Sequence, residues 1–309
     1  MRMDLTVRRW IPAFAGMTWG GIKSSFPRKR ESRQRGAGPT ATRYVWALIL
    51  GAILNPSAAA DDAVRAQLSI GAKATVTDVV DGDTVIVDPA PDGAPQIRLV
   101  GIQAPKLPLG RKGFKAWPFS SRSKTHLEKL VLGRAVTLYF GGTRMDRHGR
   151  HLAHLFRDDG TWVQGHMLAG GMARVYSFAD NRAVVPAMLA RERGARKANR
   201  GIWVHPFYAV RDTDADRLMR RLGTFQVIEG TVRDAARVKS RVYLNFGDDW
   251  RSDFTITLNS RARRLFQRDG IDPLNFQGKR LRIRGWLRKR NGPMIDASHP
   301  EQFEIIVPP

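Results

Sequence analysis

The segment from residue 73 to residue 88 constrains the fold most strongly, because its pattern is that of two paired strands. It reads KATVTDVVDGDTVIVD, in which apolar and polar residues alternate and many side chains are β-branched. Alternation with β-branched residues is typical of strands, and Asp-Gly between two such runs is a turn signal. The segment therefore predicts two strands joined at DGD, and QIRLVGI at 96–102 predicts a third.

Helices and further strands follow in an order that suggests a small barrel. Residues 117–132 predict a helix with serine as its N-cap and Gly133 at its end. Strands are predicted at 134–140 and 149–156, and helices at 163–176 and 184–203. Three strands, a helix, two strands and two helices indicate a barrel of the OB type with helices packed outside. The fold class is mainly β with helices (α+β).

A second pattern occupies the C-terminal part of the chain. Residues 223–309 supply about five strands, with one helix, SRARRLFQRDG, between the third and the fourth. That is again the order of an OB-like barrel, and no short-period repeat is present. The predicted organisation is an N-terminal extension at 1–42, a signal peptide at 43–60, a first domain at 61–208, a linker at 209–222 and a basic domain at 223–309.

The charge of the chain indicates its partners. The formal net charge is +24 and the pI about 11.3, which favours polyanions such as nucleic acid, acidic polysaccharide or anionic lipid. Cysteine is absent, so disulfides and cysteine-based metal or redox sites are excluded. A chain without cysteine is compatible with an oxidising compartment.

Residues 43–60, RYVWALILGAILNPSAAA, have the pattern of a secretory signal. A basic residue, an apolar run and a small-residue end predict cleavage after Ala60 and export to the periplasm or the medium. The apolar run at 45–54 is short for a membrane span, and an uncleaved membrane anchor is the alternative.

The first forty residues predict a start codon assigned too far upstream. WIPAFAGMT at 10–18 and FPRKRESR at 26–33 resemble translated copies of a repetitive intergenic element of bacterial genomes. Leaving out residues 1–60 removes ten Lys/Arg and two Asp/Glu, so the remainder keeps a net charge of +16.

Four short motifs follow one another along the first domain. DGDT stands at 81–84, RLVGIQAP at 98–105, DRHGR at 146–150, and GMARV with GIW at 171–175 and 201–203. With this spacing, residues 73 to about 204 resemble the staphylococcal nuclease (thermonuclease) family. The resemblance implies an OB barrel that hydrolyses DNA and RNA with calcium, and it makes residues 61–208 a staphylococcal nuclease-like domain.

The resemblance assigns roles to four matching residues. The family's first metal carboxylate falls on Asp83, with Asp81 beside it as an outer neighbour of the metal or as a simple turn residue. The two arginines that clamp the phosphate in catalysis fall on Arg98 and Arg150. A guanidinium suits this role because it matches two phosphate oxygens at once.

Three positions depart from the family pattern. The chain has Gln103 where the family has an aspartate, and Ala104 where it has a threonine that ligates through its backbone carbonyl. Lys106 stands where the family has its catalytic glutamate. Calcium or another divalent cation should bind weakly to this set, and a protonated lysine accepts no proton from water.

The role of Lys106 stays open at this point. It can bind phosphate directly in place of the metal's charge, or act as the base if burial and neighbouring cations deprotonate it. Another acid can also replace the base: Glu128, Asp146 or Asp158.

Further residues of the first domain are candidates for nucleic-acid contact. Arg147 and His148 lie within DRHGR, and Tyr176 and Phe178 lie near the family's base-stacking tyrosines, with core packing as the alternative. His148, His151 and His154 invite a zinc interpretation, but a spacing of three on a strand sends neighbours to opposite faces.

In the second domain, KRLRIRGWLRKRNG at 279–292 interleaves arginines with apolar residues. Arg280, Arg282 and Arg284 share one strand face, and with Trp286 and Arg288 they predict a track for a polynucleotide backbone. A solvated basic strand is the alternative.

Three functions remain. The sequence favours an exported protein that binds DNA or RNA through a phosphate clamp while its metal-dependent hydrolytic site is altered or lost, because Gln103 and Lys106 replace two acids. An active metal-dependent nuclease with a rearranged base is the first alternative. An envelope scaffold that binds an anionic polymer or a protein is the second. Contact with a membrane is expected only through an uncleaved signal segment.

Overall fold

The structure, a computed structural model, describes residues 56–307, which belong to one compact unit. The predicted N-terminal extension and most of the predicted signal segment lie outside the described residues. Within residues 56–307, no helix has both the length and the apolar character needed to cross a membrane.

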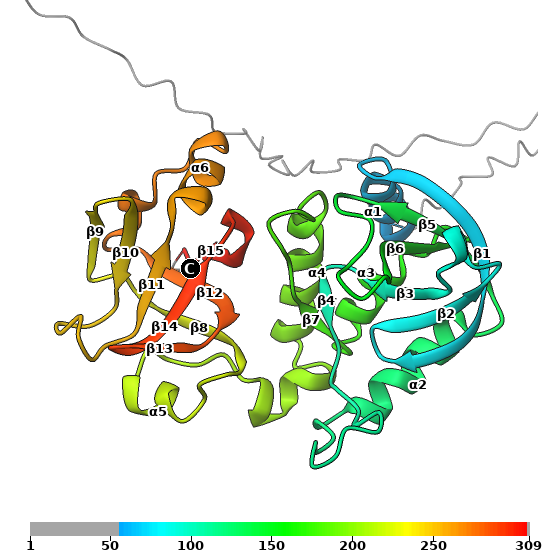
Figure 1. The fold of residues 1–309 in the computed structure, drawn as a ribbon, viewed down its shortest axis with the longest axis horizontal. Helices are drawn as coiled ribbons and strands as arrows, with labels where there is room; N and C mark the ends of the chain where they lie inside the picture. Colours follow the sequence, from blue (N-terminus) through cyan, green and yellow to red (C-terminus); the bar gives the residue numbers. More distant parts are fainter. Residues whose placement is uncertain (1–55, 308–309) are drawn as a thin grey trace, which may run out of the picture. The chain divides into compact units, whose positions relative to one another are not determined.

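The first domain is a closed barrel of five strands, as predicted. The strands are β1 (Ser69–Asp81), β2 (Thr84–Asp88), β3 (Gln96–Leu99), β5 (Ala135–Phe140) and β6 (His151–Arg157). Their order around the barrel is β1-β2-β3-β6-β5, with β3 and β6 parallel and the other paired strands antiparallel. Register shifts within β1 let this long strand pair with β2 on one side and β5 on the other (Figure 1).

Helices surround this barrel and share its apolar core. They are α1 (Pro56–Arg65), α2 (Ser120–Val131), α3 (Val163–Ala169) and α4 (Val185–Lys197). The predicted serine N-cap of α2 is wrong, because the cap residue is Phe119 and no side chain caps the helix. The helix predicted at 163–176 ends at Ala169. Gly171, at φ +64, then packs against the backbone of Arg200, and the chain continues as β7 (Arg174–Val175), paired with β4 (Ile102–Gln103).

The second domain has its own apolar core, formed by its strands and helix α6. The short helix α5 (Ala215–Met219) lies in the predicted linker. The elements of the second domain are β8 (Phe225–Thr231), β9 (Asp234–Val238), β10 (Arg241–Asn245), β11 (Thr255–Leu258), α6 (Ser260–Arg268), β12 (Arg280–Trp286), β13 (Arg288–Arg290), β14 (Gly292–Ala297) and β15 (Phe303–Ile305).

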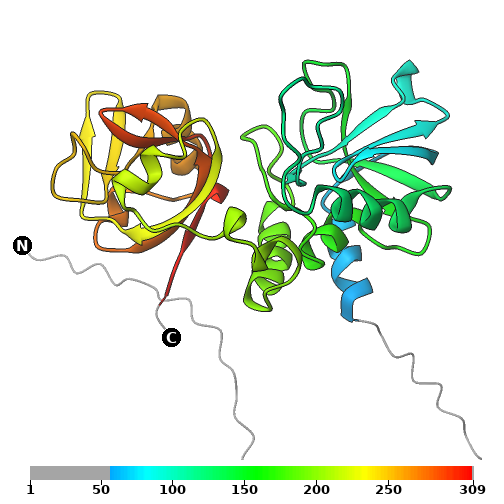
Figure 2. The ribbon, with the colours of Figure 1, turned by 90° about the horizontal axis from the view of Figure 1, so that it is seen from below.

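The strands of the second domain pair as two sheets, β13-β14-β11-β10-β9 and β15-β12-β8. Two residues separate β8 from β9 and one separates β12 from β13, so the same two segments pass from one sheet into the other. Followed through these two bends, the pairing returns to its starting strand, as in an OB barrel. Figure 2 shows the chain passing once from the first domain, cyan to green, to the second, yellow to red.

Candidate functional site

The turn between β1 and β2 buries the aspartate that the resemblance assigned to the metal. Asp83 is fully buried, and its backbone N–H donates to Asp81 Oδ1 at 3.1 Å. Gly82 packs so closely that a Cβ there would lie 2.1 Å from Ser123 Oγ and 2.7 Å from the Cβ of Ala104. Packing against α2 and the segment after β4 therefore fixes the turn and aims Asp83 inward.

Lys106 binds both oxygens of Asp83. Its Nζ lies 2.8 Å from Oδ1 and 2.7 Å from Oδ2, and 3.4 Å from Oδ2 of Asp81. The N–H of Ala104 donates to Asp83 Oδ2 at 2.7 Å, so Ala104 lies against Asp83 as expected but is seen to contact it through its N–H. The lysine ammonium thus occupies the position beside the aspartate where a cation would bind.

The neighbouring charges set the ionisation of the two aspartates in opposite directions. Burial alone would raise the pKa of Asp83, but the positive charges of Arg98 and Lys106 hold that pKa at about 2. Burial and the charge of Asp83 raise the pKa of Asp81 above its usual value. Asp83 is therefore the anion that holds Lys106 in place.

Arg98 is anchored to the backbone on the same side of the barrel. Its guanidinium donates to the carbonyl oxygens of Asp83, Leu99 and Ile102 at 3.0, 2.7 and 2.6 Å, and lies 3.3 Å from the carboxylate of Asp83. The side chain is 12% exposed. Its Nε–H has no partner among residues 56–307, so a donor remains for a phosphate oxygen.

Arg150 directly precedes β6 and is oriented by Asp146. Its guanidinium contacts Asp146 Oδ2 at 2.8 and 2.6 Å, while Oδ1 accepts from the backbone of His148 and Arg150. Arg150 stands two residues before Leu152, the register partner of Arg98. The structure therefore places Arg98 on β3 and Arg150 directly before β6, the strand that pairs with β3.

Gln103 is not available as a metal ligand, which corrects that prediction. The side chain is buried, and its Oε1 accepts from Arg174 Nε at 3.0 Å and Nη2 at 2.7 Å. Pairing of β4 with β7 brings these residues together across the first domain. Arg174 lies inside the GMARV motif but was not recognised as a site residue, because its partner is remote in sequence.

The donor set does not fit calcium. A calcium ion takes six to eight oxygen ligands with several carboxylates among them. Here Asp83 is bound to Lys106, Gln103 is bound to Arg174, and Lys106 replaces a third acid. Across the described part of the chain, no group of three or more His, Cys, Asp or Glu side chains is arranged to hold a metal.

The three alternative acids have other partners. Glu128 lies 3.8 Å from Lys124 on α2, and Asp158 lies 2.9 Å from Lys73. The carboxylate of Asp146 forms an ion pair with Arg150, one of the two predicted clamp arginines. Burial would raise its pKa, but its hydrogen bonds with Arg150 and His148 lower it, which makes it a weak proton acceptor.

The three histidines do not form a zinc site. His148 is exposed and accepts from Arg147 Nε at 3.2 Å, which keeps both residues at the surface next to Arg150. His151 and His154 are buried and contact different partners, the carbonyl of Pro91 and the indole of Trp162.

Tyr176 and Phe178 form an edge-to-face pair with ring centroids 4.8 Å apart. Tyr176 also packs on Phe225, and its hydroxyl accepts from Trp286 Nε1 at 3.0 Å. These contacts give Tyr176 a structural role beside Trp286. Phe178 stays 47% exposed and can still stack on a base.

The predicted arginine track on β12 is wrong in its central member. Arg284 is 1% exposed and pairs with Glu192 of α4 at 2.9 and 3.0 Å and with Glu304 of β15 at 2.7 Å. Arg280 and Arg282 share Glu229 at 2.9 and 2.5 Å. The three arginines do share a face, but carboxylates neutralise it. Arg288 remains exposed and only loosely paired, 3.7 Å from Asp296.

A five-stranded barrel with a buried aspartate between two basic side chains, and a second arginine on the neighbouring strand, defines the nuclease class of OB barrels. Comparison with known proteins confirms this class. The model of the family described as staphylococcal nuclease homologue matches residues 96–205.

The relatives agree. An uncharacterized endonuclease of Escherichia coli is 34% identical over 129 residues, which are 41% of this chain and 74% of the relative. The thermonuclease of Staphylococcus hyicus is 27% identical over 127 residues, 40% of this chain and 72% of the relative. A probable staphylococcal-like nuclease of rice is 33% identical over 108 residues, 35% of this chain and 26% of the relative. The chain belongs to the staphylococcal nuclease homologue family.

Proposed function

We propose that this protein binds nucleic acid through a phosphate clamp in which Lys106 supplies the positive charge that a metal would otherwise supply, and that it does not hydrolyse the polymer. The observation that carries the proposal is the position of Lys106 Nζ, 2.7 and 2.8 Å from the two oxygens of Asp83. An ammonium in this place both excludes a second cation by repulsion and presents positive charge to an incoming phosphate.

The clamp itself consists of Arg98, Arg150 and Lys106. Arg98 is anchored by backbone carbonyls, so it changes little when a phosphate binds. Arg150 is pre-oriented by Asp146, and a phosphate competes with that carboxylate for its guanidinium. Lys106, with a side chain that is 22% exposed, reaches the solvent from the buried pair.

Hydrolysis lacks its proton acceptor. The lysine that stands at the base position is engaged as a cation with Asp83, so it has no lone pair for a proton from water. Loss of a general base costs roughly 10²- to 10⁴-fold in rate, and the missing metal charge removes further stabilisation of the transition state.

The test uses the full chain with single-stranded DNA and RNA. We expect binding that is unchanged by EDTA, calcium or magnesium, without cleavage, and weaker binding by Arg150→Ala. Asp83→Asn, which keeps the side-chain shape, serves as the control for metal dependence. Cleavage that EDTA stops and Asp83→Asn abolishes would instead establish an active nuclease with a different base, as the names of the relatives suggest.

Export is a separate part of the proposal. The signal-like pattern at 43–60 supports secretion with cleavage after Ala60. N-terminal sequencing of the protein recovered from the periplasm or medium should begin at Asp61. A mature chain that begins before residue 43 would rule the signal peptide out.

A further inference from the structure

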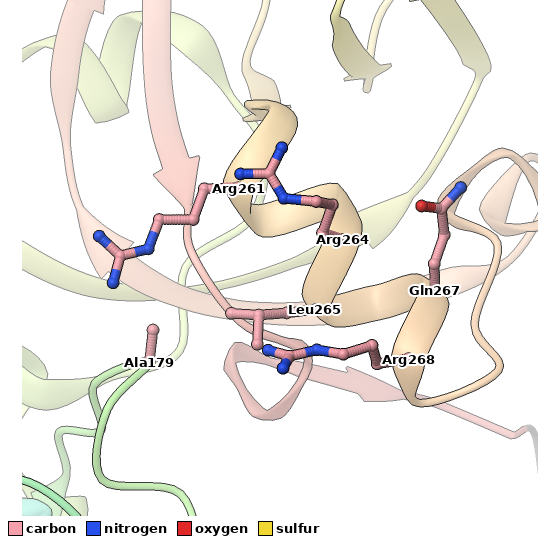
Figure 3. Close-up of a pocket in the computed structure, with 6 residues that line it drawn as sticks. All are labelled: Ala179, Arg261, Arg264, Leu265, Gln267 and Arg268. Atoms are coloured by element: carbon pink, nitrogen blue, oxygen red, sulfur yellow. The ribbon is translucent and has the colours of Figure 1, made fainter.

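The exposed face of α6 carries three arginines around a hollow in the surface. Arg261, Arg264 and Arg268 line a hollow of about 590 Å³ together with Leu265, Gln267 and Ala179 (Figure 3). Spacings of three and four residues put the arginines on one side of the helix. Figure 3 shows Arg261 and Arg268 extending toward the side on which Ala179 lies.

These three guanidinium groups carry uncompensated charge. All three are exposed, and none has an ion pair or hydrogen bond with another of residues 56–307. The nearest acid in sequence, Asp269, pairs with Arg182, which also binds Glu301 at 2.7 Å. Asp269 and Glu301 are therefore paired with Arg182 and do not neutralise the three arginines of the hollow.

The contrast with β12 shows that such a face is not the rule in this protein. Arg280, Arg282 and Arg284 also lie on one face, yet each of them pairs with a glutamate. Three like charges within reach of one another repel, so the free face of α6 disfavours the folded state slightly unless an anion binds there. Forked guanidinium donors around a concave surface match phosphate oxygens.

An exposed aromatic residue directly precedes Ala179, which lines the hollow. Phe178 is 47% exposed and is held in place by its edge-to-face contact with Tyr176. An exposed ring one residue along the chain from an arginine-lined hollow supplies the two kinds of contact that single-stranded nucleic acid uses, with a base on the ring and its phosphates on the cations.

We propose that the hollow on α6 is a second binding site for the phosphate backbone of single-stranded nucleic acid, with a base stacked on Phe178. This site is separate from the clamp residues Arg98, Arg150 and Lys106. It rests on the proposed function only for the identity of the polymer. The second domain then contacts further nucleotides of a strand that is bound at the clamp of the first domain, which increases the affinity.

The experiment compares two triple variants of the full chain with an oligothymidylate of about 20 nucleotides, long enough for two such folds. Arg261→Gln, Arg264→Gln and Arg268→Gln are combined in one protein. The control combines Arg134→Gln, Lys197→Gln and Arg200→Gln, which are also exposed but lie outside α6 and do not line this hollow. Because all six side chains are exposed, both proteins should fold, and circular dichroism verifies this.

We expect the α6 triple variant to bind at least about tenfold more weakly at low salt, because each phosphate contact contributes through counterion release. The slope of log affinity against log salt should fall by about 2, since each lost contact with a single strand removes about 0.7. The control triple variant should change the slope by much less. An equal change in both variants, or none in the α6 variant, would overturn the proposal.

A second measurement tests the stacking partner. Phe178→Ala should weaken binding of oligothymidylate about 5- to 100-fold but leave binding of an abasic oligonucleotide unchanged. Binding to vesicles with anionic lipid is measured as well. If the α6 triple variant lost vesicle binding but kept oligonucleotide binding, the arginine face of α6 would be assigned to membranes instead. Arg150→Ala, measured alongside, tests the clamp alone. The results can therefore contradict the proposed site on α6 without contradicting the proposed clamp, or the reverse.

Discussion

A lysine at position 106, where the family has a glutamate, changes the local charge from negative to positive. The partners of the neighbouring residues are consistent with a cation at this position. Asp83 is held as an anion by Lys106 and Arg98, and Gln103, neutral where the family has an acid, is bound to Arg174. At the scale of single residues, the buried carboxylate of Asp83 is therefore balanced by the cations of Lys106 and Arg98.

This consistency predicts what is needed to restore a nuclease. Lys106→Glu together with Gln103→Asp should return two carboxylates, of which the one at position 106 is the proton acceptor, and should produce calcium-dependent cleavage faster than the parent by roughly 10²-fold or more. Calorimetry with calcium and a cleavage assay with and without EDTA measure the two effects. Lys106→Glu alone is the control. Calcium binding without any cleavage would show that the geometry of the base differs from the family's.

A second residue-scale prediction concerns acid stability. Burial lowers the pKa of His154 to about 3, and its Nδ1 accepts from Trp162 Nε1 at 3.4 Å. Between pH 6.5 and pH 3 the unfolded chain binds a proton at this site that the folded chain does not, so stability rises with pH there by roughly 1.4 kcal/mol per unit. Urea denaturation across this range should show that slope. His154→Gln should flatten it, whereas His148→Gln, at an exposed site, should not.

At the scale of elements, the packing of β12 against α4 depends on a buried ion pair. Arg284 bridges Glu192 and Glu304, and Glu192 also accepts from the backbone of Val175 at 2.6 Å. Arg284→Met removes the cation that bridges two buried carboxylates, of which Glu192 keeps Arg196 at 2.8 Å and Glu304 keeps Arg193 at 3.2 Å. The loss should destabilise the protein by about 3–5 kcal/mol.

Denaturant unfolding measures this loss, and a double variant tests its cause. Arg284→Met with Glu192→Gln should recover part of the stability, because one of the two buried carboxylates that faced Arg284 is neutralised as well. Arg288→Met, at an exposed position of β13, should stay within about 0.5 kcal/mol of the parent. Equal losses from Arg284→Met and Arg288→Met would exclude the buried pair as the cause.

The elements also show which features of the fold and the site could be predicted from the sequence alone. The closed barrel of the first domain could be predicted because alternation, turn residues and element order are local signals. Asp83, Arg98 and Arg150 could be singled out because they stand in short motifs. The pairs Gln103–Arg174 and Arg284–Glu192 could not, since their members are 71 and 92 residues apart and meet only through tertiary pairing. Alternation along 280–284 correctly placed three arginines on one face but could not reveal the glutamates opposite them.

At the scale of the whole molecule, two separate apolar cores lie within one compact unit. Polar interactions of Arg284 with Glu192 and of Arg182 with Glu301 join the domains, as does the bond between Ser177 and His299 at 2.7 Å. These contacts, rather than a shared apolar core, link the first domain to the second.

This arrangement predicts coupled unfolding of the two domains. In low salt the parent should unfold in one calorimetric transition, with equal calorimetric and van't Hoff enthalpies, because separating the domains breaks the buried ion pair of Arg284 with Glu192. Arg284→Met combined with Arg182→Met should split the transition into two, since each apolar core can then melt by itself. Scanning calorimetry of both proteins distinguishes the cases, with Arg288→Met as the control that should keep a single transition. Two transitions already in the parent would mean that the domains are independent and that their binding sites act together only through the polymer they share.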